Sequence, residues 1–206
     1  MEKTKFDISH YPEVVSDTLR IKIAETYNIN PDRILVGAGV VDLIHITLLS
    51  IINPGDTVLM PDITFPTFEF ITIMVNGNPK FIPHKKDLDI NFDAFEKMLK
   101  DNVKVVILSN PNNPTGIQLD PERLTHIIDR NQDTMFFIDE ANVDLGGESL
   151  IDFAAKYENT FVFRSFSKGF GLAGLRVGFQ IGNTGIMQAI KRRQPPFTVS
   201  SVAQEV

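Results

Sequence analysis

The sequence predicts an α/β fold of three layers, in which a mostly parallel β-sheet lies between two layers of helices. Short apolar runs rich in Val, Ile and Phe alternate with longer amphipathic stretches, which is the pattern of strands joined by crossover helices. Most of the runs are nearly continuous in apolar character, as in strands buried on both faces. The chain has 206 residues, 43% of them hydrophobic, and is therefore long enough to bury a sizeable core.

The strands are expected at the apolar runs, which in chain order are ILVG, TVLM, PKFI, VKVVILS, TMFFIDE, TFVF and RVGFQIG. Helices are expected between them, at Glu13–Tyr27, Val40–Ile52, Phe92–Lys100, Pro121–Asn131 and Gly185–Arg193. Asp120 precedes a proline at the first position of one of these helices, and this pair is a common helix start. No repeat or linker interrupts the order, so we expect a single domain over residues 1–206.

Composition and charge exclude several classes of protein. The net charge is −6 and the 20 basic residues are dispersed, which argues against a nucleic-acid partner. The absence of cysteine excludes disulfides and thiol catalysis and fits a reducing compartment. The start MEKTKFDISH has no signal-peptide character, and the most apolar run, Ile44–Ile52, contains His45 and Thr47. We therefore expect a soluble, cytoplasmic protein without a membrane segment or a metal site.

Polar residues follow three of the expected strands, at the sheet edge where such folds bind ligands. VKVVILS is followed by NPNNPTG (110–116), TMFFI by Asp139 and Glu140, and TFVF by SFSKGFGLAGLRVG (165–178). Each segment also has a purely structural interpretation, because Asn-Pro tracts form tight loops and carboxylates commonly end strands in solvent. The three together predict a site at the carboxyl ends of the strands.

The third segment combines Ser165, Ser167, Lys168 and Arg176 with small and apolar residues. A lysine in a desolvated position beside another cation becomes an amine nucleophile that forms Schiff bases. Hydroxyl groups and an arginine are the donors that a phosphate requires. Together with a buried carboxylate such as Asp139, these groups fit one common cofactor, pyridoxal phosphate.

The same segment contains a dinucleotide-binding pattern, GxGxxG, formed by Gly169, Gly171 and Gly174. That fingerprint requires a helix directly after the glycines and an acidic residue about 20 positions further on. Here the glycines lead into RVGFQIG, which is an expected strand, and the region around Gln194 has no acid. We therefore reject a nicotinamide-binding interpretation.

In register, NPNNPTG, IDEA and SFSK followed by Arg176 resemble the fold-type-I, pyridoxal-phosphate-dependent aminotransferases of class I/II. The segments HYPEVV, GAGVVDLI and PPFTVSSVAQ look most like the histidinol-phosphate aminotransferase group of that family. The resemblance implies that Lys168 holds the cofactor covalently and then acts as general base and acid. It implies that Asp139 pairs with the pyridine nitrogen, that Asn113 donates a hydrogen bond to the ring O3′, and that Phe65 stacks on the ring.

The resemblance also implies how the phosphate is held. Its donors would be Ser165, Ser167 and Arg176, together with the backbone N–H groups of Val40 and Val41 at the start of a helix, where the dipole favours anions. Without the register of the motifs, Phe65 would be interpreted as a core residue.

Tyr11, in the family's RYP position, would reach the cofactor phosphate of a neighbouring subunit, which implies a homodimer with shared active sites. Packing of Tyr11 against the first helix is the alternative. The chain departs from the family at Asn142, where relatives carry a tyrosine that also bonds O3′, and at His10, which replaces the arginine of RYP. Val40 and Val41 stand where relatives commonly carry a small or hydroxylated residue and an acid.

Family members are longer, so the chain looks truncated, with the N-terminal arm and the C-terminal small domain absent. The implied reaction is amino transfer from histidinol phosphate or a related amino acid, with glutamate and 2-oxoglutarate as co-substrates. Two alternatives remain open. The chain could be a truncated cofactor-binding remnant without turnover, or an enzyme like the threonine-phosphate decarboxylases, which share the same motifs.

Overall fold

The fold is described from a computed structural model, in which residues 8–205 are placed. One sheet of seven strands runs in the order β1-β7-β6-β5-β4-β2-β3. β7 is antiparallel to both of its neighbours, and the other pairs are parallel. The predicted α/β class with a mostly parallel sheet is thus confirmed.

Every expected strand is present. The strands are β1 (Ile34–Gly37), β2 (Thr57–Pro61), β3 (Asn78–Ile82), β4 (Val103–Ser109), β5 (Met135–Asp139), β6 (Thr160–Ser165) and β7 (Gly178–Ile181). The last strand starts later than RVGFQIG implied, because Arg176 adopts a left-handed backbone with φ of 52°, which a strand does not accommodate. β3 lies at the edge of the sheet and is mostly exposed, as its Pro79 permits there.

Five of the eight helices in the described part of the chain match the predicted ones to within a few residues at each end. The eight helices are α1 (Asp17–Tyr27), α2 (Val40–Ile51), α3 (Thr67–Met74), α4 (Phe92–Met98), α5 (Pro121–Arg130), α6 (Ile151–Lys156), α7 (Thr184–Lys191) and α8 (Ser201–Glu205). α1 begins after Glu13, whose carboxylate accepts a hydrogen bond from the Thr18 N–H at 2.8 Å. α3 and α6 escape sequence analysis because α6 is a single short stretch and α3 exposes the apolar residues Phe70, Ile73 and Met74, which hides its amphipathic period.

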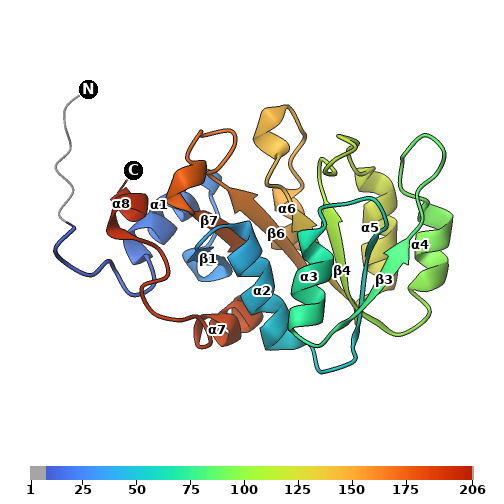
Figure 1. The fold of residues 1–206 in the computed structure, drawn as a ribbon, viewed down its shortest axis with the longest axis horizontal. Coiled ribbons are helices and arrows are strands. Elements are labelled where there is room, and N and C mark those ends of the chain that lie inside the picture. The colour runs from blue at the N-terminus through green and yellow to red at the C-terminus, as the bar shows by residue number, and fades with distance from the viewer. Residues whose placement is uncertain (1–7, 206) are drawn as a thin grey trace.

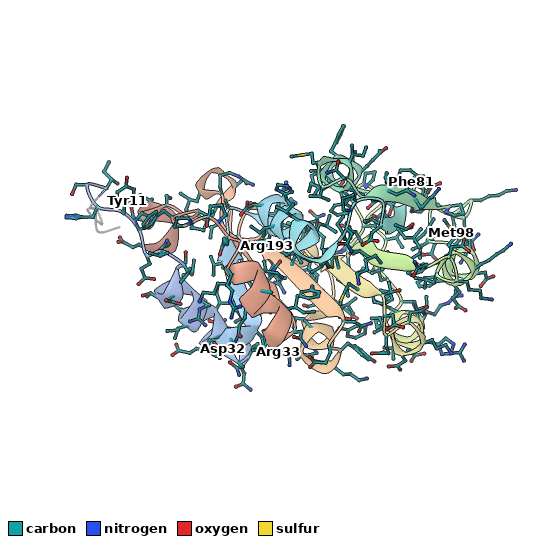
Figure 2. All side chains as sticks on the ribbon, turned by 90° about the horizontal axis from the view of Figure 1, so that it is seen from below. Tyr11, Asp32, Arg33, Phe81, Met98 and Arg193 are labelled. Atoms are coloured by element: carbon teal, nitrogen blue, oxygen red, sulfur yellow. The ribbon has the colours of Figure 1, made fainter. Side chains whose placement is uncertain are left out.

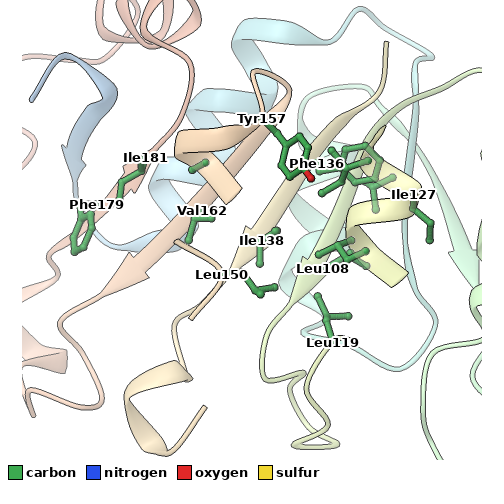
Figure 3. Close-up of a cluster of buried hydrophobic side chains, with 14 of the residues drawn as sticks. Leu108, Leu119, Ile127, Phe136, Ile138, Leu150, Tyr157, Val162, Phe179 and Ile181 are labelled. Carbon is green, nitrogen blue, oxygen red and sulfur yellow. The ribbon is translucent and has the colours of Figure 1, made fainter. Parts of the chain in front are cut away.

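The sheet is covered on both faces, which gives the three expected layers. One face packs against α1, α4, α5, α6 and α8, and the other packs against α2, α3 and α7. In Figure 1, α2 and α3 lie in front of the sheet and α5 lies behind it. Figure 3 shows the core of the first face, where Leu108, Ile138 and Val162 of successive strands meet Ile127 and Leu150. This packing holds the strand ends in place.

The topology brings four segments that are distant in sequence together at the carboxyl-terminal ends of the parallel strands. β1, β4, β5 and β6 all run in the same direction. Their last residues, Gly37, Ser109, Asp139 and Ser165, therefore lie at the same end of the sheet. β7 starts there as well, since Gly178 pairs with Ser165. Among residues 8–205, no helix has the length and apolar character that a membrane crossing requires.

Candidate functional site

A pocket of about 290 Å³ lies at the carboxyl-terminal ends of the parallel strands. It contains ten of the residues named from the sequence. Its lining consists of Val40, Val41, Phe65, Ser109, Asn113, Asp139, Ala141, Asn142, Ser165, Ser167, Lys168, Ala173 and Arg176. The fold thus gathers nearly all of the expected site residues, and it adds Ser109, Ala141 and Ala173, whose short side chains carried no signal of their own in the sequence.

Asp139 forms the acidic side of the pocket. It ends β5 with only 5% of its surface exposed, and its Oδ1 accepts a hydrogen bond from the Ala141 N–H at 2.8 Å. Burial raises the pKa of Asp139 to about 6, and this hydrogen bond and the charge of Lys168 oppose the rise. A buried carboxylate of this kind is stabilised in its ionised form by a cationic group placed against it.

Lys168 and Arg176 form the cationic side, on the loop between β6 and β7. Both residues are exposed, so Lys168 is not in the desolvated position that sequence analysis associated with a reactive lysine. Within the loop, the Ser165 Oγ accepts a hydrogen bond from the Ser167 N–H at 3.0 Å. Arg176 Nη1 donates to the Ala173 carbonyl at 3.1 Å. The loop therefore presents two cations and two hydroxyl groups to the same pocket.

The start of α2 completes the anion-binding part of the pocket. Gly39 precedes this helix with φ of 91°, and a Cβ there would lie 2.7 Å from Arg176 Nη2. The glycine therefore allows the guanidinium to approach the helix start closely. Among residues 8–205, no side chain caps this helix, which leaves the first amides, including those of Val40 and Val41, as donors. Such a start, beside an arginine and hydroxyl groups, favours a phosphate.

The opposite wall is aromatic and amide-rich. Phe65 is half-buried and contacts Phe68 edge to face, with ring centroids 5.6 Å apart. It therefore lines the pocket and also packs against the hydrophobic core. Asn112 holds the Phe65 segment to the NPNNPTG loop. Its Nδ2 donates to the Ile63 carbonyl at 2.9 Å, and its Oδ1 accepts from Thr64 Oγ1 at 2.9 Å. Sequence analysis singled out the neighbouring Asn113 and missed this bridging role.

Tyr11 lies outside the pocket of its own chain. It is 83% exposed, and its ring packs against Phe197 at a centroid distance of 4.9 Å instead of against the first helix. In Figure 2 it lies at one end of the molecule, far from Phe81 and Met98. A role for Tyr11 in this pocket would therefore require a second subunit.

The glycines of the loop between β6 and β7 do not form a dinucleotide-binding fingerprint. Gly169, Gly171 and Gly174 are followed by a short 3-10 turn, Ala173–Leu175, and then by β7, so the helix that the fingerprint needs is replaced by a strand. Within residues 8–205, no group of three or more His, Asp or Glu side chains is arranged to hold a metal ion.

Comparison with known proteins places this architecture in a large group of relatives. The family model for aminotransferase class I and II matches residues 3–206. The chain is 32% identical over 200 residues to a histidinol-phosphate aminotransferase of Caldanaerobacter subterraneus subsp. tengcongensis. That alignment covers 97% of this chain and 57% of the relative. The chain thus spans little more than half the length of the curated relatives it matches.

Two solved structures show the same fold. The histidinol-phosphate aminotransferase of Clostridium acetobutylicum superposes with a TM-score of 0.88 at 24% identity, over 96% of this chain and 60% of the other. The L-threonine-O-3-phosphate decarboxylase of Porphyromonas gingivalis superposes with a TM-score of 0.83 at 26% identity, over 96% of this chain and 62% of the other. With the family model matching almost all of its residues, this chain belongs to the aminotransferase class I and II family.

Proposed function

We propose that this chain is the large, cofactor-binding domain of a pyridoxal-phosphate-dependent aminotransferase. The proposal rests on one observation above all, the placement of Lys168, Asp139 and Arg176 around a single pocket. The substrate proposed is histidinol phosphate or a related amino acid, with glutamate and 2-oxoglutarate as co-substrates, because the similar curated proteins are histidinol-phosphate aminotransferases.

The pocket fits the cofactor in size and in chemistry. Its volume of about 290 Å³ is close to the lower end of the range for small-molecule sites, roughly 300–1,000 Å³. The start of α2, the two serines and Arg176 would hold the phosphate. Phe65 would lie against the ring, while Asn113 and Asn142 would offer amide donors to its hydroxyl. When bound, pyridoxal phosphate supplies an aldehyde that reacts with amines and a ring that accepts electron density.

The two charged sides of the pocket would perform different tasks. The Lys168 amine would hold the cofactor through a covalent bond and, once free, move a proton at the substrate α-carbon. The Asp139 carboxylate would hold a proton on the pyridine nitrogen, because a buried anion stabilises the adjacent cation. Asn142 offers an amide where a phenol is usual in the family, so we expect weaker control of the ring hydroxyl.

The proposal is tested by incubating the full chain with pyridoxal phosphate and treating it with borohydride. We expect a yellow protein whose visible band bleaches, with the reduced cofactor attached at Lys168 in a peptide mass map. Lys168→Ala should remove the attachment completely, whereas Lys156→Ala, which alters an exposed lysine of α6, should leave it unchanged. A colourless wild-type protein that retains no cofactor would reject the proposal.

A decarboxylase is the second candidate, because the L-threonine-O-3-phosphate decarboxylase of Porphyromonas gingivalis is 26% identical over 96% of this chain. The two reactions differ in their products. Release of CO₂ from threonine phosphate would favour the decarboxylase, and conversion of the bound cofactor to its amine form by glutamate or histidinol phosphate would favour the aminotransferase. A cofactor-loaded chain that does neither would be a binding domain without turnover.

We also propose that the chain works as a homodimer in the cytoplasm. The exposed position of Tyr11, away from its own pocket, supports a contact with the pocket of a second subunit. Sedimentation of the cofactor-loaded chain tests the oligomeric state, and we expect the mass of a dimer. If the dimer forms, Tyr11→Phe should weaken cofactor retention.

A further inference from the structure

A buried ion cluster involves β6 and the segment after β5, next in sequence to residues of the pocket, and contributes none of the lining residues. Its centre is Arg164, whose side chain is 7% exposed. Arg164 Nη2 lies 2.6 Å from Asp144 Oδ1, and Nη1 lies 3.5 Å from Glu140 Oε2 and 3.3 Å from Ser149 Oγ. Glu140 is fully buried. A single guanidinium from β6 therefore contacts two carboxylates of the segment that follows β5.

Each member of the cluster adjoins a residue of the pocket. Arg164 immediately precedes Ser165 on β6, and Glu140 immediately follows Asp139 at the end of β5. Asp144 lies in the 3-10 turn Val143–Leu145, just after Asn142. Arg164 and Glu140 are thus each next to a lining residue, and Asp144 is two residues from the lining residue Asn142.

Asp144 also contacts the loop that carries the lysine. A Cβ placed on Gly169 would lie 2.3 Å from Asp144 Cβ, so the backbone of Gly169 lies directly against this aspartate. Gly169 is the residue after Lys168. A continuous path of contacts therefore runs from Glu140 through Arg164 and Asp144 to the backbone beside the lysine.

Stability alone is a weak explanation for this cluster. The desolvation of a buried ion pair commonly offsets its Coulomb attraction, and replacement by apolar residues is often neutral. Within the described part of the chain, Arg164 Nε is buried without a hydrogen-bond partner, which adds a further cost. What the guanidinium provides is geometry, because its planar fork reaches two carboxylates at once. Glu140 also accepts hydrogen bonds from Ser149 Oγ at 2.7 Å and from the Leu150 N–H. Arg164 therefore links an already fixed carboxylate to Asp144.

We propose that Arg164 is a positioning residue that sets the separation between Asp139 and Lys168. It does so by linking the fixed Glu140 on one side, through Asp144, to the lysine loop on the other. The inference rests on the proposed function, since the cofactor is the molecule that would contact both residues. It adds a residue outside the pocket to the groups on which the chemistry depends.

The test uses the full chain loaded with pyridoxal phosphate and follows the pH titration of its visible absorption band. This band reports protonation of the nitrogen that joins Lys168 to the cofactor, which depends on the placement of the surrounding charges. We expect Arg164→Lys and Asp144→Asn each to shift the titration midpoint by about 0.5 pH units or more, a threefold change in proton affinity. Arg164→Lys keeps the charge but lacks the planar fork that holds both carboxylates in a fixed geometry.

Arg33→Lys is the matched control. Arg33 also joins three segments, because it donates to the Gly182 and Ala155 carbonyls at 3.0 and 3.2 Å and lies 3.4 Å from Glu158 Oε1. It directly precedes β1 and therefore lies at the amino-terminal end of that strand, at the opposite end of the sheet from the pocket. We expect this variant to lower the melting temperature without moving the titration midpoint.

The outcomes are distinct. If Arg164→Lys and Asp144→Asn lower the melting temperature but titrate like the wild type, the cluster is merely structural and the inference is wrong. If Arg164→Lys does not fold, Asp144→Asn alone decides, because Asp144 is the more exposed member at 26%. A wild-type chain that retains no cofactor rejects the proposed function together with this inference, whereas an unshifted midpoint in loaded variants rejects the inference alone.

Discussion

The acidic and cationic sides of the pocket differ in how the chain supports them. Asp139 ends a central strand, is 5% exposed, and accepts a hydrogen bond from the Ala141 N–H. Lys168 and Arg176 lie on an irregular loop and are exposed. The sheet thus holds the Asp139 carboxylate in place, whereas the two cations extend from a loop with their side chains exposed to solvent. The two charged sides therefore differ in local support, and Lys168, to which the proposed chemistry assigns the covalent bond, lies on the less supported side.

The largest effect is expected from removing the buried charge with Asp139→Asn, which keeps the shape and the acceptor for the Ala141 N–H. We expect the rate of conversion of bound cofactor by an amino donor to fall about 10²–10³-fold, since a fixed charge at a reacting group contributes on that scale. Single-turnover absorbance measurements check this. A variant with wild-type turnover would show that the acidic side is structural only.

The same variant should stabilise the cofactor-free chain at neutral pH. Asp139 has a pKa of about 6 when folded against a reference value of 3.8, so the folded state holds the proton more tightly. The ionised group therefore destabilises the fold progressively as pH rises from about 4 to above 6, by up to about 3 kcal/mol. Urea unfolding at pH 4 and pH 8 should show the variant equal to wild type at pH 4 and more stable at pH 8. Equal stability at both pH values would contradict the assigned burial.

An intermediate effect is expected on the cationic side from Gly39→Ala. The new Cβ would lie 2.7 Å from Arg176 Nη2 and displace the guanidinium, so we expect cofactor affinity to fall about tenfold, as for loss of one charge-assisted hydrogen bond. Titration calorimetry with pyridoxal phosphate measures the loss. Backbone strain at φ of 91° should add about 1–3 kcal/mol of destabilisation.

Gly55→Ala is the control for that strain. Gly55 has φ of 89°, and a Cβ there would meet nothing within 4 Å. We expect Gly55→Ala to lose about as much stability as Gly39→Ala but to keep the wild-type affinity for pyridoxal phosphate. Equal affinity losses in both variants would mean that strain, and not contact with Arg176, weakens the anion site.

The smallest effect is expected at the aromatic wall from Phe65→Leu. Ring contacts contribute about 0.5–1.5 kcal/mol, so cofactor affinity should fall by about two- to tenfold. Phe70→Leu, which alters an exposed ring on α3, is the matched control and should have no effect. An unchanged affinity in Phe65→Leu would show that the two charged sides bind the cofactor without help from this wall.

Much of the fold and of the site follows from local patterns. β-Branched and aromatic runs predicted every strand, and the polar segments NPNNPTG, Asp139-Glu140 and SFSK predicted the pocket, because parallel strands end at one edge of a sheet. Helix α3 was missed since its outer face is apolar, and Asn112 was missed since an asparagine in a turn has the same local pattern whether or not it bridges two loops.

Local patterns along the chain therefore specify the order of the strands, the family, and the chemical types of residue at the strand ends. Only the tertiary structure decided that Asp139 is buried while Lys168 is exposed, that Gly39 makes room for Arg176, and that Arg164 joins two carboxylates. The physical reason is that periodicity and turn chemistry depend on neighbours along the chain. Burial, close approach and ion pairing depend instead on residues that meet only when the sheet has formed.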